Sequence, residues 1–444
     1  MNEALFQFIW QYSLYNPTQL KSTTGETITI IHPGRRNTNA GPDFEEARVR
    51  IGNTTLVGNV ELHVNSSDWK KHGHDTDPAY QNIILHVVYF DDEVDDQHNF
   101  PTLQLSRQIP PYIIDQYTNL IQTTQPIACA KQLGKVNELV KESWLNRLLA
   151  ERWEQKLNEW KELLEQSKGD WRNLLYWRMA ANFGFKVNTT PFLMLARSIP
   201  LNVLARHKEN LVQIEALLFG QAGMLEEKFE EDYPALLQKE YQYLKKKYSL
   251  EAIPSHLWKF LRLRPANFPT IRIAQFAALI HRSFHLFSKI IESLSIKEIH
   301  SLLEVHASEY WSAHFRFGEA QKKATIKYLG RNSIDNIIIN TIAPIQFLFA
   351  HYHGNIDQQE RALQLLSGVD AEHNKFIAHW EQNGWKPMNA AESQSLLQLF
   401  HNYCEPKRCL ECAIGLNIVK HKQDVLSCYQ PIPNFDKTAS DFTL

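Results

Sequence analysis

The spacing of apolar residues changes character near residue 138, and this change limits the fold of the chain more than any other feature. Before this point, short segments rich in β-branched and alternating apolar residues are typical of β-strands. After it, apolar residues recur at intervals of three and four, as in RLLAERWEQKLNEWKELLEQ, which predicts amphipathic helices as far as about Tyr403. We therefore expect an α+β protein, in which a sheet domain is followed by a large all-α domain.

The N-terminal part predicts the element order αβββαβ. A helix is expected first, then three strands, a short helix capped by Ser67 or Asp68, and a continuous apolar strand of the kind found at the centre of a sheet. Their ranges are 4–15, 27–31, 47–51, 55–64, 67–80 and 83–90, and a further strand-like piece covers 102–106. The expected domains are 1–130 for the sheet, 131–403 for the helices and 404–444 for a cysteine cluster and tail.

The composition is that of a folded soluble protein, because 43% of the 444 residues are hydrophobic and 22% are charged. Disordered and fibrous classes are therefore excluded. The first residues lack the basic segment and apolar run of a secretory signal. Apolar stretches such as IIINTIAPIQFLFAHY are too short or interrupted to cross a membrane. We expect a cytoplasmic protein without membrane contact.

Charge is distributed unevenly although the net charge is only −2. Residues 1–130 contain 8 Lys and Arg against 15 Asp and Glu, whereas the remainder contains 39 against 34. An acidic first part suits a cation, and a basic second part weakly suits a polyanion such as nucleic acid.

Side chains able to bind a metal are concentrated between residues 41 and 86. Glu61 and His63, in the motif GNVELHV, project from the same face of a strand because strand side chains alternate. Asp43, on the neighbouring strand of the hairpin, can meet them. Two carboxylates and an imidazole can hold Mg²⁺ or Mn²⁺ and activate a water molecule. The alternative is that both carboxylates only accept hydrogen bonds from loop backbone.

Further histidines leave a zinc site open. His72 and His74 flank a glycine, and with His63 or His86 and an aspartate they would form a His-rich catalytic zinc site. If the ion is instead Mg²⁺ or Mn²⁺, His72 and His74 would contact substrate or transfer protons. An imidazole such as His86, inside an apolar strand, is more often a hydrogen-bonded core residue.

The motifs P-D at 42–43 and E-L-H at 61–63 resemble those of the PD-(D/E)XK restriction-endonuclease-like nucleases. That superfamily has an αβββαβ core with an Asp at the start of the second strand and Glu-x-Lys on the third. The resemblance covers about the first 115 residues, and it implies that Asp43 and Glu61 bind the metal in hydrolysis of DNA or RNA. It also implies that Glu3 on the first helix supplies an additional carboxylate.

His63 departs from this pattern, because it stands where the superfamily has lysine. Positive charge at the site would then come from His63 itself, from Lys70 or from Lys71, or hydrolysis has been lost.

The chain as a whole resembles a bacterial family of unknown function. The resemblance is carried by GPDF, GNVELHV, SDWKKHGHD, LHVV and the late KRCLECAIG. It spans nearly the full length and supports the domain layout, but it implies no activity.

Three of the five cysteines lie within nine residues in the pattern C-x4-C-x2-C, beside two basic residues that lower thiol pKa values. This clustering predicts a zinc ion or an iron–sulfur cluster. The candidates for the fourth ligand are Cys428, Cys129, His401 and His421. The alternative is three reduced thiols without a metal. The cysteine ligands considered are Cys404, Cys409, Cys412, Cys428 and Cys129.

In the helical part, Arg262, Arg264 and Arg272 alternate with aromatic residues around prolines and could clamp phosphates at a helix start. The alternative is an interhelical loop whose arginines pair locally. The leading function from the sequence is therefore metal-dependent hydrolysis of nucleic-acid phosphodiesters. The rivals are a non-catalytic nucleic-acid-binding or scaffold protein with a degenerate nuclease fold, and a His-rich zinc hydrolase acting on a small molecule.

Overall fold

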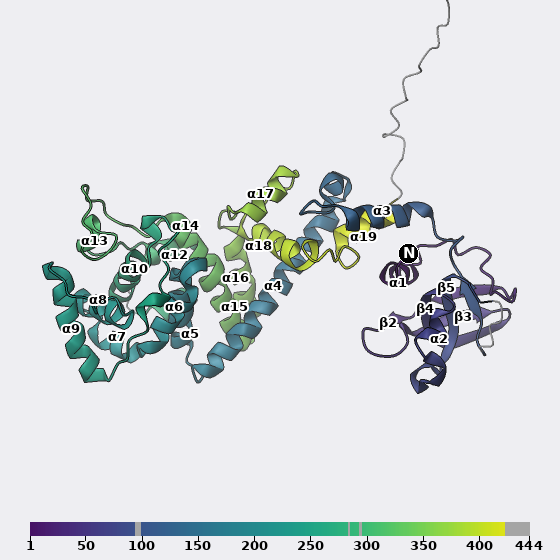
Figure 1. Ribbon diagram of the computed structural model, residues 1–444, viewed down its shortest axis with the longest axis horizontal. Helices are drawn as coiled ribbons and strands as arrows, with labels where there is room; N and C mark the ends of the chain where they lie inside the picture. Colours follow the sequence, from purple (N-terminus) through teal and green to yellow (C-terminus); the bar gives the residue numbers. More distant parts are fainter. Residues whose placement is uncertain (94–98, 283–284, 293–294, 422–444) are drawn as a thin grey trace, which may run out of the picture. The chain divides into compact units, whose positions relative to one another are not determined.

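A computed structural model describes residues 1–93, 99–282, 285–292 and 295–421 (Figure 1). The chain forms two compact units, which divide at residues 144/145 and 399/400. The first unit contains residues 1–144 together with the described residues from 400 onward, and the second contains 145–399. The sequence analysis placed the boundaries at 130 and 403.

The first unit is built on one mixed sheet, so the predicted α+β class is confirmed. The strand order is β1-β3-β4-β5-β6, with β2 paired to β3. The pairs β1/β3 and β3/β4 are antiparallel, whereas β4/β5 and β5/β6 are parallel. The elements of this unit are α1 (Glu3–Gln11), β1 (Ile28–His32), β2 (Arg35–Arg36), β3 (Phe44–Ile51), β4 (Thr54–Asn65), α2 (Asp68–Lys71), η1 (His74–Thr76), η2 (Pro78–Tyr80), β5 (Ile83–Phe90), β6 (Thr102–Gln104), α3 (Pro111–Gln122), η3 (Ala130–Lys135), η7 (Phe400–Cys404) and α19 (Ala413–Lys420).

Burial along the strands explains this order. In β5 every residue from Ile83 to Val88 is buried, as expected for a strand with parallel neighbours on both sides. In β3 the buried residues Phe44, Ala47 and Val49 are interspersed with exposed charged residues. The helix α1 packs on β4 through an apolar face that includes Phe6, which is fully buried. The sheet and this helix therefore share one core.

Two predicted helices are shorter in the structure. The helix expected over 4–15 ends at Gln11, since Ser13 adopts a left-handed backbone with φ of 50° that a helix cannot contain. The helix expected over 67–80 is divided into α2, η1 and η2. Gly73 breaks it with φ of 74°, a conformation that glycine adopts without steric cost.

The second unit consists of helices joined by loops, and its described residues include two isolated β-bridges, His306–Tyr328 and His314–Ala320, but no β-strand. Its core contains Trp153 and Trp160, which lie on the same helix seven residues apart. The elements are α4 (Glu138–Gln166, whose first seven residues belong to the first unit), α5 (Trp171–Phe183), α6 (Phe185–Ser198), α7 (Leu201–His207), α8 (Leu211–Gln221), α9 (Asp232–Tyr248), η4 (Ser255–Leu257), η5 (Pro265–Asn267), α10 (Pro269–Arg282), α11 (Leu286–Glu292), α12 (Ile296–Leu303), α13 (Tyr310–Ala313), α14 (Arg331–Ile337), η6 (Ile338–Ile342), α15 (Ala343–Tyr352), α16 (Ile356–Ser367), α17 (Lys375–Gln382) and α18 (Ala390–Leu399).

One helix among the described residues is long and apolar enough to cross a membrane by length and composition alone. It runs without a break from Arg331 to Tyr352 through α14, η6 and α15, so it is longer than the sequence analysis expected. Inside the structure 61% of its apolar window is buried, which is the burial of a core helix.

Candidate metal and active site

The pairing of β3 with β4 brings the two predicted carboxylates together. Phe44 lies opposite Val60, so Asp43, just before Phe44, meets Glu61, just after Val60. The Asp43 amide donates to Oε2 of Glu61 at 3.0 Å, and the Leu62 amide donates to Oδ2 of Asp43 at 3.1 Å. These backbone bonds fix both side chains, because each carboxylate is held by the other's strand.

Burial makes it costly to ionise both groups. The pKa of Glu61 is raised from its ordinary value of 4.5 to about 8. Burial is the largest cause, and the negative charges of Asp43 and Glu3 add to it. Burial, opposed by hydrogen bonds and by the charge of Arg36, raises the pKa of Asp43 from 3.8 to about 6. A bound cation would relieve this repulsion, because it favours the charged form of both acids.

The helix α1 and the strand β2 add polar residues that the sequence analysis missed. Gln7 Nε2 donates to Oδ1 of Asp43 at 2.7 Å, and Arg36 Nη2 donates to Oε1 of Gln7 at 3.2 Å. Gln7 follows Glu3 by four residues, so both lie on one face of α1. The spacing from Glu3 is the one sequence signal that could have identified Gln7.

His63 lies at the centre of a chain of imidazoles. It is fully buried on β4, with Nδ1 3.0 Å from Nε2 of His86 and Nε2 3.1 Å from Nδ1 of His72. Burial, followed by the charges of His86, His72 and His74, lowers its pKa from 6.5 to about 3. His63 is therefore neutral at physiological pH and cannot replace the positive charge of the superfamily's lysine, as the sequence analysis had allowed.

Three histidines meet beside Glu61. The nearest ring nitrogens of His63, His72 and His74 all lie within 4.8 Å of one another. Nε2 of His74 is buried, makes no hydrogen bond within the described part of the chain, and lies 3.4 Å from Oε1 of Glu61. The same oxygen lies 3.7 Å from Nε2 of His63. Glu61 thus joins the carboxylates to the imidazoles in one group.

Two aromatic side chains form a wall of this group. The ring of Tyr80 stacks on His74 with 3.9 Å between centroids, and Trp69 lies 5.2 Å from both His74 and His86. Burial and the negative charges of Glu61 and Asp43 raise the pKa of Tyr80 to about 12. Tyr80 therefore stays protonated beside the carboxylates, a placement for which the sequence carried no signal.

The two lysines considered for the site make other contacts. Nζ of Lys70 lies 3.1 Å from each carboxylate oxygen of Glu93, and Nζ of Lys71 lies 2.7 Å from Oδ1 of Asp68. Both lysines are exposed. Both lysines are therefore engaged in ion pairs with Glu93 and Asp68, and neither makes a hydrogen bond to Asp43 or Glu61 among the described residues.

The predicted arginines belong to the second unit. Arg272 is buried, its guanidinium lies 4.5 Å from the ring centroid of Phe185, and it donates to Gln275, Asn267 and Ser333. These contacts give Arg272 a place in the core of the helical unit. Arg262 and Arg264 are exposed.

The structure gathers four of the five cysteines in the first unit, where all four are free thiols: Cys129, Cys404, Cys409 and Cys412. Cys428 lies outside the described residues. The histidines 401 and 421 are exposed.

Fold and site together define an α+β protein with a buried carboxylate and histidine group on the sheet of its first unit. The sequence matches the family described as Protein of unknown function (DUF2851) over residues 3–375, and the chain belongs to this family. The matched range covers every residue of the histidine and carboxylate group but ends before Cys404. Searches of curated proteins and of solved structures found no match.

Proposed function

We propose that the protein is a metal-dependent hydrolase that cleaves phosphodiester bonds in DNA or RNA. The observation that carries this proposal is the position of Glu61, whose carboxylate contacts Asp43 on one side and lies within 3.7 Å of His63 and His74 on the other. A buried glutamate and a neighbouring aspartate beside imidazoles form a set of ligands that a divalent cation satisfies and that an apolar core does not.

The mixed donors favour Mn²⁺ over Mg²⁺ as the ion. Carboxylate oxygens suit both ions, but an imidazole nitrogen suits transition metals and is a poor ligand for Mg²⁺. Glu61 and Asp43 would supply the oxygens and His74 the nitrogen. A divalent ion there would acidify a bound water and polarise the phosphoryl oxygen.

The protein's own residues would serve the remaining needs of hydrolysis. His72 is exposed at the edge of the group and is suited to exchange a proton with solvent or a leaving group. Arg36 is exposed on β2, and its charge acts on Asp43. We assign to Arg36 the phosphate contact that the sequence analysis sought in Lys70 and Lys71, because a guanidinium binds phosphate through two parallel hydrogen bonds.

The order of elements supports the nuclease interpretation. Leaving aside the two-residue β2, the chain runs α1, β1, β3, β4, α2, β5, with Asp43 directly before β3 and Glu61 within β4. This is the αβββαβ order of the PD-(D/E)XK nucleases, with aspartate and glutamate in the corresponding places. His63 remains the departure from that pattern.

Two rivals keep specific support. The grouping of His63, His72 and His74 favours a zinc hydrolase acting on a small molecule, because three imidazoles and an open position are a common catalytic zinc site. The lack of a lysine at the Glu-x-Lys position favours a nucleic-acid-binding protein without turnover.

The test is to incubate the full chain with labelled single- and double-stranded DNA and RNA, adding Mn²⁺, Mg²⁺ or Zn²⁺ in turn. Cleavage with Mn²⁺ that is lost in Asp43→Asn and Glu61→Gln would support the proposal. Glu45→Gln is the matched control, since it removes the same charge from an exposed position on β3. Binding without cleavage under every metal would overturn hydrolysis and leave the non-catalytic rival. Zinc-dependent hydrolysis of a small ester, without cleavage of nucleic acid, would support the zinc hydrolase instead.

A further inference from the structure

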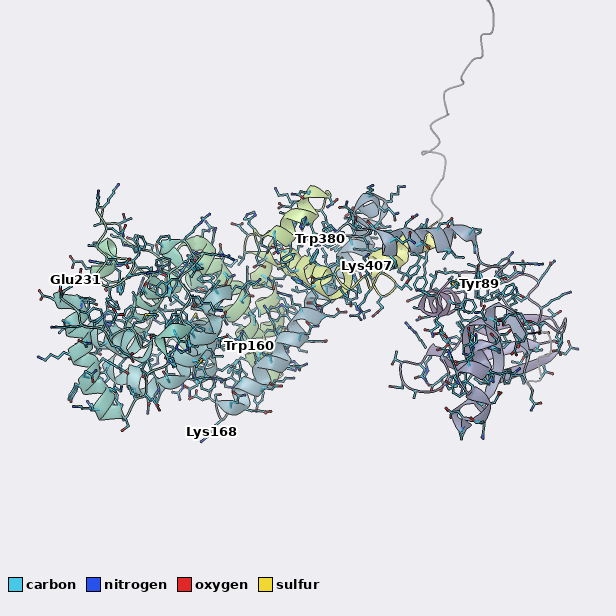
Figure 2. The ribbon with its side chains drawn as sticks, viewed as in Figure 1. Tyr89, Trp160, Lys168, Glu231, Trp380 and Lys407 are labelled. Atoms are coloured by element: carbon cyan, nitrogen blue, oxygen red, sulfur yellow. The ribbon has the colours of Figure 1, made fainter. Side chains whose placement is uncertain are left out.

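Two segments far apart in sequence pack together within the first unit. The segment 111–135 contains α3 and η3, and the segment 400–421 contains η7 and α19, which lies beside α3 (Figure 1). Gln116 Nε2 donates to the His421 carbonyl at 2.8 Å, and Lys407, labelled in Figure 2, donates to the Thr123 carbonyl at 2.9 Å. This packing brings Cys129 to the C-x4-C-x2-C segment.

The four thiols form one group. Cys129, Cys409 and Cys412 are buried and Cys404 is partly buried. Burial is the main cause of the raised pKa values of Cys129 and Cys404. The charges of the other cysteines raise both values further: Cys412 and Cys409 act on Cys129, and all three act on Cys404. Cys129 directly precedes η3 and Cys412 directly precedes α19, and these two elements contact each other. The four thiols therefore form one group, the four-cysteine cluster.

The backbone around Cys409 and Cys412 is built as a tight loop. Cys412 is the N-cap residue of α19, and the nearby backbone amides of Ile414 and Gly415 lower the pKa of its thiol against the larger effect of burial. A Cβ on Gly415 would lie 2.1 Å from the Cys409 carbonyl oxygen, so only glycine allows this close approach. Backbone amides close to a sulfur favour the thiolate, which is the form that binds metal.

A single zinc ion requires sulfurs that lie close together. With Zn–S bonds of about 2.3 Å, tetrahedral geometry puts the sulfurs of a zinc site about 3.8 Å apart. Among the described residues, no three cysteine sulfurs lie within 4.8 Å of one another, since the histidine group alone meets that distance. Thiolates of an iron–sulfur cluster lie further apart, because each binds a different iron atom.

The surroundings also suit a negatively charged cluster. The charge of Lys407 lowers the pKa of Cys409 against the effect of burial, and Arg408 lies over the ring of Tyr403 at 5.2 Å. Trp144 packs against Tyr403, with 5.2 Å between ring centroids. Nearby cations and aromatic rings that exclude water stabilise such a centre.

We propose that the four-cysteine cluster binds a [4Fe–4S] centre that fastens the C-terminal segment 400–421 to the segment that follows the sheet. Cys129 is the fourth ligand, in place of Cys428 or a histidine. The centre is structural, and it closes the first unit by linking its N-terminal and C-terminal parts. This inference is independent of the proposed hydrolase.

The test begins with the full wild-type chain, produced and purified without oxygen and analysed for iron, acid-labile sulfide and zinc. We expect about four iron and four sulfide per chain, and a broad visible absorption that bleaches on reduction. One zinc per chain without sulfide, or no metal at all, would overturn the proposal. This measurement needs no variant and therefore does not depend on a mutant folding.

Variants then test the choice of ligands. Serine replacements of Cys129 and Cys404 should each remove most of the iron, whereas Cys428→Ser, the matched control, should retain it. Loss of iron in Cys428→Ser with retention in Cys129→Ser would refute the ligand assignment. Hydrogen exchange of amides 400–421 should rise when the iron is chelated from the wild type, and unchanged exchange would refute the fastening role. Glu61→Gln should keep its iron, which separates this outcome from that of the proposed hydrolase.

Discussion

Replacing Glu61 by glutamine should stabilise the protein when divalent metal has been removed. Glu61 is 5% exposed and is buried next to a second carboxylate, so its ionised form is costly in the folded state. Glutamine has the same shape, and its amide oxygen can still accept the hydrogen bond from the Asp43 amide. Its amide group carries no charge, so it removes the repulsion with Asp43.

The magnitude follows from the pKa. The folded-state pKa of Glu61 is about 8 against an ordinary 4.5, so the folded state binds more protons than the unfolded chain between these values. Stability therefore falls as pH rises through this window. At about 1.4 kcal/mol per pH unit, the cost reaches about 3 kcal/mol at pH 7 and stays under about 1 kcal/mol at pH 5. The variant lacks this cost.

The assay is urea unfolding in the presence of a chelator at about pH 5 and about pH 7. Hydrogen exchange of the amides in β3 and β4 localises the change to the first unit. We expect Glu61→Gln to gain about 3 kcal/mol over the wild type at pH 7 and little at pH 5, with Glu45→Gln unchanged at both. A variant that is no more stable than the wild type at pH 7, or a gain independent of pH, would show that Glu61 is not ionised at a cost in this site.

Three further outcomes follow from packing and burial. Gly415→Ala should destabilise the loop by a steric clash with Cys409 and lower the iron content, as measured by metal analysis, while Gly330→Ala, at an exposed position with open space and a negative φ, should not. Trp160→Ala, at a fully buried position labelled in Figure 2, should cost about 3 to 5 kcal/mol of unfolding free energy in urea. Glu215→Gln should stabilise the helical unit by about 2 to 3 kcal/mol near pH 7 and not at pH 4.5, since burial raises the Glu215 pKa to about 7; a gain equal at both pH values would contradict this.

Regular elements of the sheet were predictable because each has one dominant signal. The strand 83–90 was expected from its continuous apolar run, and the structure gives β5 the same bounds. The hairpin of β3 and β4 turns at Gly52 and Asn53, residue types that favour tight turns between β-rich segments. The two helices that ended early did so at single residues, Ser13 and Gly73, whose left-handed backbone arises from tertiary context and not from local periodicity.

The site could be predicted only where it follows from strand geometry. Alternation on one strand put Glu61 and His63 on the same face, and the hairpin brought Asp43 to them. Tyr80 and Arg36 come from an irregular segment and a two-residue strand, so no periodic pattern fixes where they lie. The ion pairs of Lys70 and Lys71 with Glu93 and Asp68 were equally hidden, because they depend on side-chain conformation.

One arginine, Arg36, acts electrostatically on both candidate centres of the first unit. Arg36 donates to Gln7, the same side chain that holds Asp43, and its charge lowers the pKa of both Asp43 and Glu411. Glu411 stands between Cys409 and Cys412, so Arg36 lies within electrostatic reach of the carboxylate site and of the cysteine loop. Metal ligation that holds the cysteine loop in place would therefore also hold the Glu411 carboxylate near Arg36, the residue proposed to bind phosphate. The whole helical unit separates the C-terminal segment from the sheet in sequence, so chain entropy opposes closing this long loop. Metal ligation would offset this entropy and hold the segment against the first part of the unit.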